Sequence, residues 1–268
     1  MNAINIGPLM LSTDRVSALI GIAVFLAVTA IIARRMGEPL GRWSTHAFLA
    51  GVVAARLGHV AINWETFAPE PWRIVAIWQG GFHWQTGVIV AIMLLFFLVR
   101  PAGQRVAGIA SLAAGLFVWH SATLLTSGVE PIELPQHPLH TLAHEPVQLA
   151  ALGGQPMVVN LWATWCPPCR REMPMMADVA AATSDVTFVF ANQGEDAPRI
   201  RSYLGGEQLF LPNVLMDGLG ELGRHYGARG LPATLFIDTE GTLVDMHLGE
   251  ISREAFVEKI GALENTER

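Results

Sequence analysis

The chain has 268 residues, of which 51% are hydrophobic and only 15% are charged, and its mean hydropathy is +0.39. Because soluble domains usually carry about 25% charged residues, this composition excludes a disordered, fibrous or nucleic-acid-binding protein and indicates a membrane protein. Residues 1–128 hold eight basic and four acidic residues (net +4), whereas residues 129–268 hold nine and 19 (net −10). We therefore predict an apolar, slightly basic domain at 1–128 and an acidic, water-soluble domain at 129–268.

Four apolar stretches of the first domain predict four transmembrane helices. The first, Val16 to Ala33, is uncharged and about long enough to cross a hydrocarbon core of about 30 Å. The others run from about His46 to Ile62, from about Trp78 to Val99 and from about Val106 to Thr126. Arg56 and His59 make the second pattern the weakest. A cleaved signal peptide is the alternative for the first stretch, but Arg34 and Arg35 follow it as they would follow a membrane span.

The arginines between the predicted helices indicate their orientation. The first connection contains Arg34, Arg35 and Arg42, and the third contains Arg100 and Arg105, so both are expected in the cytoplasm. The second connection, Asn63 to Ile77, contains Glu65, Glu70 and a single Arg73, and three tryptophans, Trp64, Trp72 and Trp78, suit an interface on the other side. Four crossings then place everything after Thr126 outside the cytoplasm, where disulfides persist.

Arg56 lies within an apolar stretch, which is costly unless the side chain is paired or hydrated. It belongs either to a functional site in the membrane or to the structure, as an arginine that reaches the interface or binds a carbonyl group. The sequence leaves both interpretations open. It also assigns no role to His59, His83 or His120.

Three motifs of the first domain resemble a known family. They are NIGPLML near the start, AARLGHV at Ala54 to Val60, and the stretch from Ile74 to Leu95, which includes IWQGG. Together they look like the first portion of prolipoprotein diacylglyceryl transferase, a membrane enzyme that moves a diacylglyceryl group from phosphatidylglycerol to a lipoprotein cysteine. The resemblance fails at Gln85, where the family has a histidine, with His83 two residues earlier. Because a neutral amide cannot serve as a general base, we expect a scaffold that is inactive as a transferase.

The segment from Ser127 to Gln155 joins the two domains. It has four prolines and no Lys or Arg, which predicts an extended tether followed by the start of the second domain. His137, His140 and His144 could bind a metal, but prolines interrupt the segment and no acid or cysteine completes a ligand set. We therefore predict no metal site here.

The chain has two cysteines, Cys166 and Cys169, both in the acidic domain. This count excludes a disulfide-stapled scaffold and a four-thiolate zinc site. Haem attachment would need a histidine after the second cysteine, but position 170 is an arginine. The CxxC pair is therefore interpreted as a redox dithiol.

The dithiol is expected where a strand ends and a helix begins. Met157 to Trp162 is an apolar, β-branched run, and the residues after Cys169 have helical spacing. Free N–H groups at a helix start lower the pKa of a CxxC thiol from about 8.5 toward roughly 4–7, which makes Cys166 the predicted nucleophile. Cys169, one turn further, would resolve the mixed disulfide. Pro167 and Pro168 stiffen the loop and remove donors that a helix start leaves unpaired.

The other predicted elements complete an α/β domain with a central sheet. They are strands at Val186 to Ala191 and Asn213 to Asp217, helices at about Asp196 to Leu204 and up to Tyr226, a strand after Pro232, the stretch GTLVDMHLG, and a terminal helix at Arg253 to Leu263.

Two further motifs, VVNLWATWCPPCRREMPMM and YGARGLPATLFID, resemble the thioredoxin fold and, more closely, the TlpA/ResA/CcmG group of membrane-anchored extracytoplasmic thiol–disulfide oxidoreductases. The similarity covers about Leu134 to Leu263. It implies that Pro232 is cis, packs against the dithiol, holds the substrate backbone and blocks metal capture. Within the first motif Trp165, directly before Cys166, is a supporting residue of the site.

Asn160 and Glu172 also belong to the predicted site. Thioredoxin has a buried aspartate six residues before the first cysteine, where this chain has Asn160, as the TlpA group commonly does. Another acid could then accept the proton of Cys169, and Glu172 is the candidate because ResA-like members place an acid there. A glutamate that favours the helix dipole is the alternative, and the sequence does not separate the two.

The sequence thus predicts a polytopic membrane protein with an extracytoplasmic thioredoxin-like disulfide reductase that needs no cofactor. Since the membrane domain has no cysteine, a separate membrane reductant of the CcdA/DsbD kind or a small thiol must recharge the dithiol. By resemblance, the clients are disulfides of apocytochromes or other exported proteins. The alternatives are a lipid-handling, transferase-like protein with an accessory redox domain and a non-catalytic thiol-binding chaperone.

Overall fold

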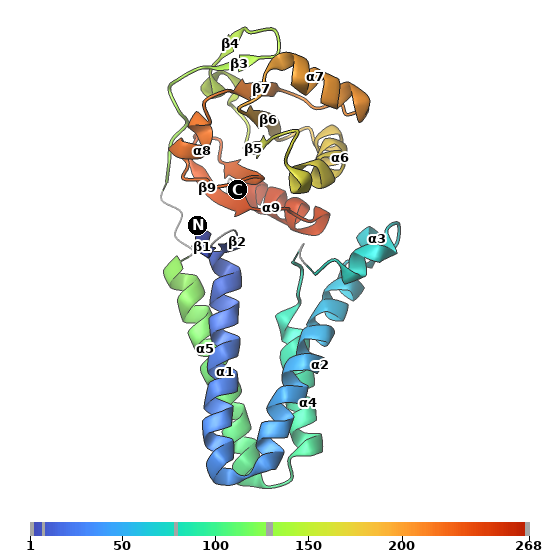
Figure 1. The fold of residues 1–268 in the computed structure, drawn as a ribbon, viewed down its shortest axis with the longest axis vertical. Coiled ribbons are helices and arrows are strands. Elements are labelled where there is room, and N and C mark those ends of the chain that lie inside the picture. The colour runs from blue at the N-terminus through green and yellow to red at the C-terminus, as the bar shows by residue number, and fades with distance from the viewer. Residues whose placement is uncertain (1–2, 7–8, 78–79, 127–130, 266–268) are drawn as a thin grey trace. The chain divides into compact units, whose positions relative to one another are not determined.

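The computed structural model describes residues 3–6, 9–77, 80–126 and 131–265. Its backbone contacts divide the chain into two units (Figure 1). Residues 13–127 form one, here called the helical unit, and residues 1–12 with 128–268 form the other, the sheet unit. A short hairpin of strands β1 (Ala3–Ile6) and β2 (Leu9–Ser12), which the sequence did not predict, precedes the helices.

The described part of the helical unit contains four apolar helices. They are α1 (Thr13–Met36), α2 (Glu38–Ile62), α4 (Trp84–Leu98) and α5 (Ala102–Thr126), with the short helices α3 (Trp64–Phe67) and η1 (Pro71–Val75) between α2 and α4. Among the described residues, α1, α2 and α5 are long and apolar enough to cross a membrane, whereas α4 has 15 residues. The third helix begins later than predicted because Gly80 and Gly81 adopt positive φ angles that interrupt a helix; Trp78 lies outside the described residues.

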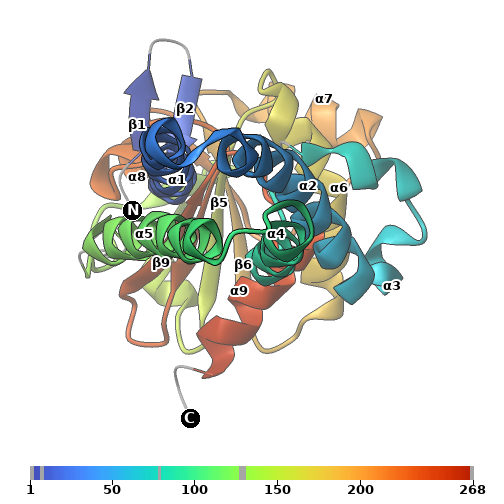
Figure 2. The same ribbon diagram turned by 90° about the horizontal axis from the view of Figure 1, so that it is seen from below.

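The four helices pack as two pairs, α1 with α5 and α2 with α4 (Figures 1 and 2). Glycines allow this close approach. A Cβ atom at Gly115 would lie 2.8 Å from both the Gly21 carbonyl oxygen and the Phe25 Cβ, and one at Gly87 would lie 2.8 Å from the Gly51 carbonyl oxygen. Small residues at such crossings bring helix backbones together in membranes, where van der Waals packing drives association.

The guanidinium of Arg56 organises the connection before α4. It is buried and donates hydrogen bonds to the carbonyl oxygens of Ile74, Gly80 and Arg73 at 2.9, 2.6 and 2.6 Å. Longer bonds reach two more carbonyls, those of Gly81 and Ala76. A guanidinium has five N–H donors, and within the described residues five backbone carbonyl groups accept from this one. The structure therefore favours the structural interpretation of Arg56.

The sheet unit has a seven-stranded sheet with strand order β4-β3-β7-β6-β5-β8-β9. Its strands are β3 (Leu139–Thr141), β4 (Pro146–Val147), β5 (Met157–Trp162), β6 (Thr187–Gln193), β7 (Val214–Asp217), β8 (Ala233–Ile237) and β9 (Leu243–Leu248). The central strands β5, β6 and β7 are parallel, and the flanking strands are antiparallel to their neighbours. The predicted fold class, apolar helices followed by a thioredoxin-like α/β domain, is confirmed.

Helices cover both faces of this sheet. They are η3 (Leu149–Leu152), α6 (Pro167–Ala182), α7 (Ala197–Gly206), α8 (Glu221–His225) and α9 (Arg253–Asn265). Residues of α6, α7 and α9 join one buried cluster, which contains both cysteines, and residues of α8 join a second cluster. The dithiol therefore lies on the α6 face of the sheet.

The sheet begins within the segment Ser127 to Gln155, for which the sequence predicted a tether followed by the start of the second domain. Strand β3 pairs with both β4 and β7, and Leu139 and Leu149 are buried in the second cluster. This agrees with the expectation that the later part of the segment starts the second domain, because apolar residues spaced among the prolines join the core.

Candidate active site

The two cysteines lie at the junction of β5 and α6. Cys166 is the N-cap of α6, Pro167 and Pro168 are its first residues, and Cys166 and Cys169 form a disulfide with their Cα atoms 5.3 Å apart. Both cysteines are buried. The junction arises because the apolar strand ends at Trp162 and a turn, closed by a hydrogen bond from Cys166 N to Ala163 O at 3.2 Å, leads into prolines whose fixed φ suits a helix start.

The start of α6 places a hydrogen-bond donor at the sulfur of Cys166. The backbone N–H of Cys169 donates to Cys166 Sγ at 3.3 Å. In the reduced protein the same donor, together with the positive end of the α6 dipole, would favour the thiolate of Cys166 over its thiol. Cys169 lies one turn deeper and is within bonding distance, as a resolving thiol must be.

Glu172 is buried in the second turn of α6. Its Oε1 accepts a hydrogen bond from Asn160 Nδ2 at 3.1 Å, and its Oε2 accepts one from the backbone N–H of Ile251 at 3.0 Å. Asn160 also donates to Thr234 Oγ1 at 3.2 Å, which ties the carboxyl group to β5 and β8. A glutamate that only favoured the helix dipole would lie in the exposed first turn, which does not fit the buried Glu172. Its role at the dithiol stays a prediction.

Burial raises the pKa of Glu172 to about 8 from its ordinary value of 4.5. The bonds from Ile251 and Asn160 act in the opposite direction, and the nearby charge of Glu250 adds to the rise. Glu172 is therefore mostly protonated at neutral pH. A buried carboxyl group in this state can exchange a proton near neutrality, as a general acid or base must.

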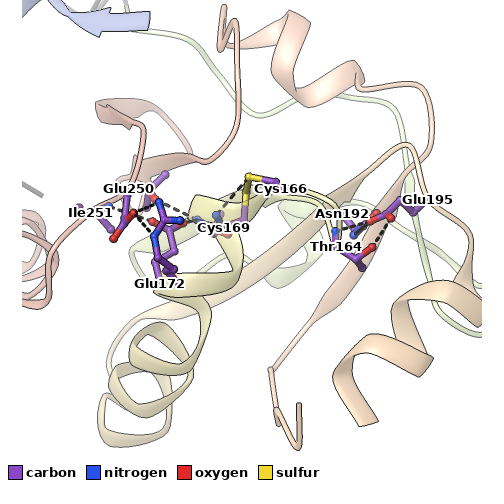
Figure 3. Close-up of a disulfide and its surroundings, with 11 residues drawn as sticks. Thr164, Cys166, Cys169, Glu172, Asn192, Glu195, Glu250 and Ile251 are labelled. Atoms are coloured by element: carbon purple, nitrogen blue, oxygen red, sulfur yellow. Dashed lines mark hydrogen bonds and ion pairs between the residues drawn. A yellow bond between two sulfur atoms is a disulfide. The ribbon is translucent and has the colours of Figure 1, made fainter. Parts of the chain in front are cut away.

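A second carboxylate lies on the other side of the dithiol (Figure 3). Glu195 accepts hydrogen bonds from both the backbone N–H and the Oγ1 of Thr164, at 2.6 and 2.5 Å, and one from Asn192 Nδ2 at 2.9 Å. Burial raises its pKa, but these bonds and the charge of Arg199 outweigh burial, so the net pKa is below its usual range. Glu195 thus remains ionised and fixes the turn that carries Cys166.

Glu195 is not among the site residues that the sequence predicted. The sequence did contain a signal for it, because Thr164 and Glu195 each come two residues after the end of a strand, β5 and β6. Neighbouring parallel strands end at the same edge of a sheet, so the two side chains could be expected to lie close together.

Two further residues predicted for the site are Pro232 and Trp165. The Leu231–Pro232 bond is cis, as the resemblance implied. Strand β8 starts at the next residue and pairs Ala233 with Leu161, so Pro232 lies at the end of β5 from which the dithiol loop departs. Trp165, next to Cys166, is exposed to solvent.

The histidines singled out in the sequence are not gathered into one site. His83 Nδ1 contacts Thr86 Oγ1 at 2.6 Å, His120 stacks on Trp119, and His59 contacts Phe67 edge-on. In the sheet unit, His137 pairs with Glu221 at 3.2 Å. Within the described ranges no group of three or more His, Cys, Asp or Glu side chains could hold a metal ion.

The fold and the dithiol at a helix start define a thioredoxin-like thiol–disulfide oxidoreductase. Residues 130–263 match the Redoxin family, and the chain belongs to that family. Residues 2–122 match the prolipoprotein diacylglyceryl transferase family, which agrees with the resemblance of the first domain. This match and the apolar helices indicate a membrane protein.

Named relatives agree with this class. The thiol-disulfide oxidoreductase ResA of Halalkalibacterium halodurans is 32% identical over 46% of this chain and 72% of its own length. The thiol:disulfide interchange protein DsbE of Tatumella citrea is 32% identical over 53% of this chain and 78% of its own. A solved structure of MTB dsbF, in mixed oxidized and reduced forms, is 28% identical over 48% of this chain and 98% of its own, with a TM-score of 0.44.

Proposed function

We propose that the protein is a membrane-anchored reductase that donates electrons from the Cys166–Cys169 dithiol to disulfides of exported proteins. The observation that carries the proposal is the position of Cys166 Sγ at the start of α6, 3.3 Å from the N–H of Cys169. This donor favours a thiolate on the nucleophilic sulfur. ResA, named a thiol-disulfide oxidoreductase, and DsbE, named a thiol:disulfide interchange protein, share this region with the chain.

The reaction has two exchange steps. The Cys166 thiolate attacks a sulfur of the client disulfide, forms a mixed disulfide and releases one client thiolate. The Cys169 sulfur, once deprotonated, attacks Cys166, forms the Cys166–Cys169 disulfide and releases the second client thiolate. The client gains two electrons, and the protein ends in the disulfide form of this structure.

Glu172 is proposed to accept the proton that Cys169 loses before it attacks Cys166. It lies three residues after Cys169 on α6, and burial raises its pKa to about 8. Asn160, which stands where thioredoxin has a buried aspartate, orients the carboxyl group of Glu172 by donating a 3.1 Å hydrogen bond to it. Pro232 is proposed to present the client backbone, and Trp165 to offer it an apolar contact.

The helical unit is proposed to anchor the sheet unit on the extracytoplasmic side. Support comes from the arginines of the α1–α2 and α4–α5 connections, which suit the cytoplasm. A separate membrane thiol reductant of the CcdA/DsbD kind would return electrons to the disulfide, and apocytochromes c are the proposed clients, by resemblance to the ResA/CcmG group.

Insulin reduction by the full chain in detergent micelles, recharged by dithiothreitol, tests the proposal. We expect the wild type to reduce insulin and Cys166→Ser to be inactive. Cys169→Ala should instead accumulate a mixed disulfide on Cys166, visible as a mass increase that excess dithiothreitol removes. Equal activity of wild type and Cys166→Ser would refute the proposal.

A transferase activity is the second candidate, because residues 2–122 match that family. Gln85, which stands where the family has a histidine, is an exposed residue in the first turn of α4. Transfer of labelled diacylglycerol from phosphatidylglycerol to a lipoprotein peptide by the full chain would support this function. No transfer under conditions where an active transferase works would remove it.

A further inference from the structure

Two arginines beside the dithiol each cover a buried carboxylate. Arg171 donates from Nε and Nη2 to Glu250 Oε2, at 2.8 and 2.6 Å. Arg199 Nε lies 2.7 Å from Glu195 Oε1. The Glu250 and Glu195 side chains are 7% and 4% exposed, whereas the Arg171 and Arg199 side chains are 52% and 62% exposed. Both pairs therefore present a cation to solvent and keep the anion inside.

The two pairs lie on opposite sides of the dithiol. Figure 3 shows Glu250 on one side of Cys166 and Cys169, and Glu195 on the other. Arg171 follows Cys169 by two residues, and Arg199 donates to Thr164 Oγ1 at 3.2 Å, two residues before Cys166. A polypeptide that brings a disulfide to Cys166 would therefore meet a guanidinium on each side.

Other charged side chains near the dithiol do not cancel the positive charge of Arg171 and Arg199. Arg170 pairs with Glu207 at 2.8 Å, and because both side chains are about half exposed, this pair is neutral toward solvent. Asp196 is exposed, but its carboxylate caps α7 and accepts from the N–H of Arg199 at 3.1 Å, where the helix start offsets its charge. Two cations thus flank the dithiol of a domain whose net charge is −10 over residues 129–268.

We infer that the Arg171–Glu250 and Arg199–Glu195 pairs select clients whose disulfide is flanked by acidic residues. The inference rests on the proposed reductase function and specifies its substrate class. At physiological salt, charges act over about 8 Å, so residues next to the client disulfide respond to the arginines more than to the distant acidic surface. Opposite charge at this range speeds encounter and holds the mixed disulfide in register.

Three disulfide peptides of one sequence, with Glu, Gln or Lys on both sides of the disulfide, test the inference. The full chain in neutral-detergent micelles is reduced, freed of reductant and mixed with each peptide, and acid-quenched thiols give the second-order rate constant. At low salt the Glu peptide should react about threefold to tenfold faster than the Lys peptide. The ratio should approach one in about 0.5 M NaCl.

Variants of Arg171 and Arg199 test whether these residues cause the preference for the Glu peptide over the Lys peptide. The double variant R171Q/R199Q should bring the ratio near one, and R171K/R199K should keep it because the charge remains. If R171Q leaves Glu250 without compensation and prevents folding, R171Q/E250Q removes both charges and should also weaken the preference. R224Q is the matched control, since Arg224 lies on α8, on the opposite face of the sheet, and should leave the ratio unchanged.

The outcomes separate the inference from the proposed function. Failure to reduce the Gln peptide would refute the reductase function itself. Reduction of all three peptides at equal rates, or a preference that survives in R171Q/R199Q, would overturn the inference and leave the reductase function standing. Slower reaction of the Gln peptide in anionic than in neutral lipid nanodiscs, abolished in R171Q/R199Q, would assign the arginines to lipid headgroups and also overturn it.

Discussion

At the residue scale, the surroundings of two glutamates shift the pKa of a carboxyl group in opposite directions, upward at Glu172 and downward at Glu195. Burial dominates at Glu172, which keeps its proton near neutrality, whereas hydrogen bonds from Thr164 and Asn192 keep Glu195 ionised. The resemblance to ResA-like proteins pointed to Glu172, but the sequence could not separate a helix-dipole role from a role at the dithiol. Burial does not fit the helix-dipole role, and burial depends on residues far away in the chain. The role at the dithiol stays a prediction.

The pKa of Glu172 predicts a pH dependence of stability. Between pH 4.5 and about 8 the folded chain keeps a proton that the unfolded chain releases, so the free energy of unfolding falls as pH rises. One proton accounts for at most about 1.4 kcal/mol per pH unit. Glu172→Gln should lose this decline and gain stability relative to the wild type as pH rises, as measured by hydrogen exchange of β5 and β8 amides, corrected for intrinsic rates.

Asp178→Asn is the control for this prediction, because Asp178 is exposed and pairs with Arg253 on the surface. It should keep the pH dependence of the wild type. If Glu172→Gln declines with pH as steeply as the wild type does, the assigned protonation of Glu172 is wrong.

At the element scale, the site depends on how strands end and helices begin. Strands β5, β6 and β7 run parallel and end at one edge, which brings together the turn before Cys166, Glu195 and Asp217. Asp217 accepts from the N–H groups of Glu221 and Leu222 at 2.7 and 2.9 Å and so starts α8. The predicted strands lie close to the observed ones, and β5 has the predicted bounds. Apolar, β-branched runs bounded by turn residues are local signals, which the sequence shows directly.

The close packing of α1 against α5 predicts that a larger side chain at Gly115 lowers the thermal stability of the helical unit. Gly115→Val would place a side chain where the Gly21 carbonyl oxygen and Phe25 already lie within 2.8 Å of a Cβ atom. Overpacking at such a contact costs about 1–3 kcal/mol, so the variant should melt at lower temperature in detergent, as followed by the loss of helical circular dichroism.

Gly103→Ala provides the comparison, because its Cβ would meet only the flexible end of Met36, at 3.5 Å. It should melt close to the wild type. Unchanged melting of Gly115→Val would mean that this helix crossing does not hold the pair together.

At the scale of the whole molecule, an apolar helical unit and an acidic redox unit share one chain, and all thiol chemistry lies in the second. Composition and charge alone predicted this division. The predicted number of four membrane crossings depends on α4, which has only 15 residues. At 1.5 Å per residue this helix is about 22 Å long, shorter than a hydrocarbon core of about 30 Å.

Reporter cysteines test the topology. In a Cys166→Ser/Cys169→Ser chain, Phe210→Cys on the exposed surface of the sheet unit should react with a membrane-impermeant maleimide in intact cells. Arg100→Cys, between α4 and α5, should react only after permeabilisation. Labelling of Arg100→Cys in intact cells, with Phe210→Cys protected, would reverse the proposed orientation.

The sequence by itself determined the two-part organisation, the apolar helices, the strand that precedes the dithiol and the helix that Pro167 and Pro168 begin. These features depend on composition, periodicity and residues a few positions apart. Only the tertiary structure decided that Arg56 binds backbone carbonyls, that β3 joins the sheet, and that Glu172 meets Asn160, 12 residues away, and Ile251, 79 residues away. Burial and hydrogen-bond partners arise when distant segments pack, and no local pattern encodes which segments meet.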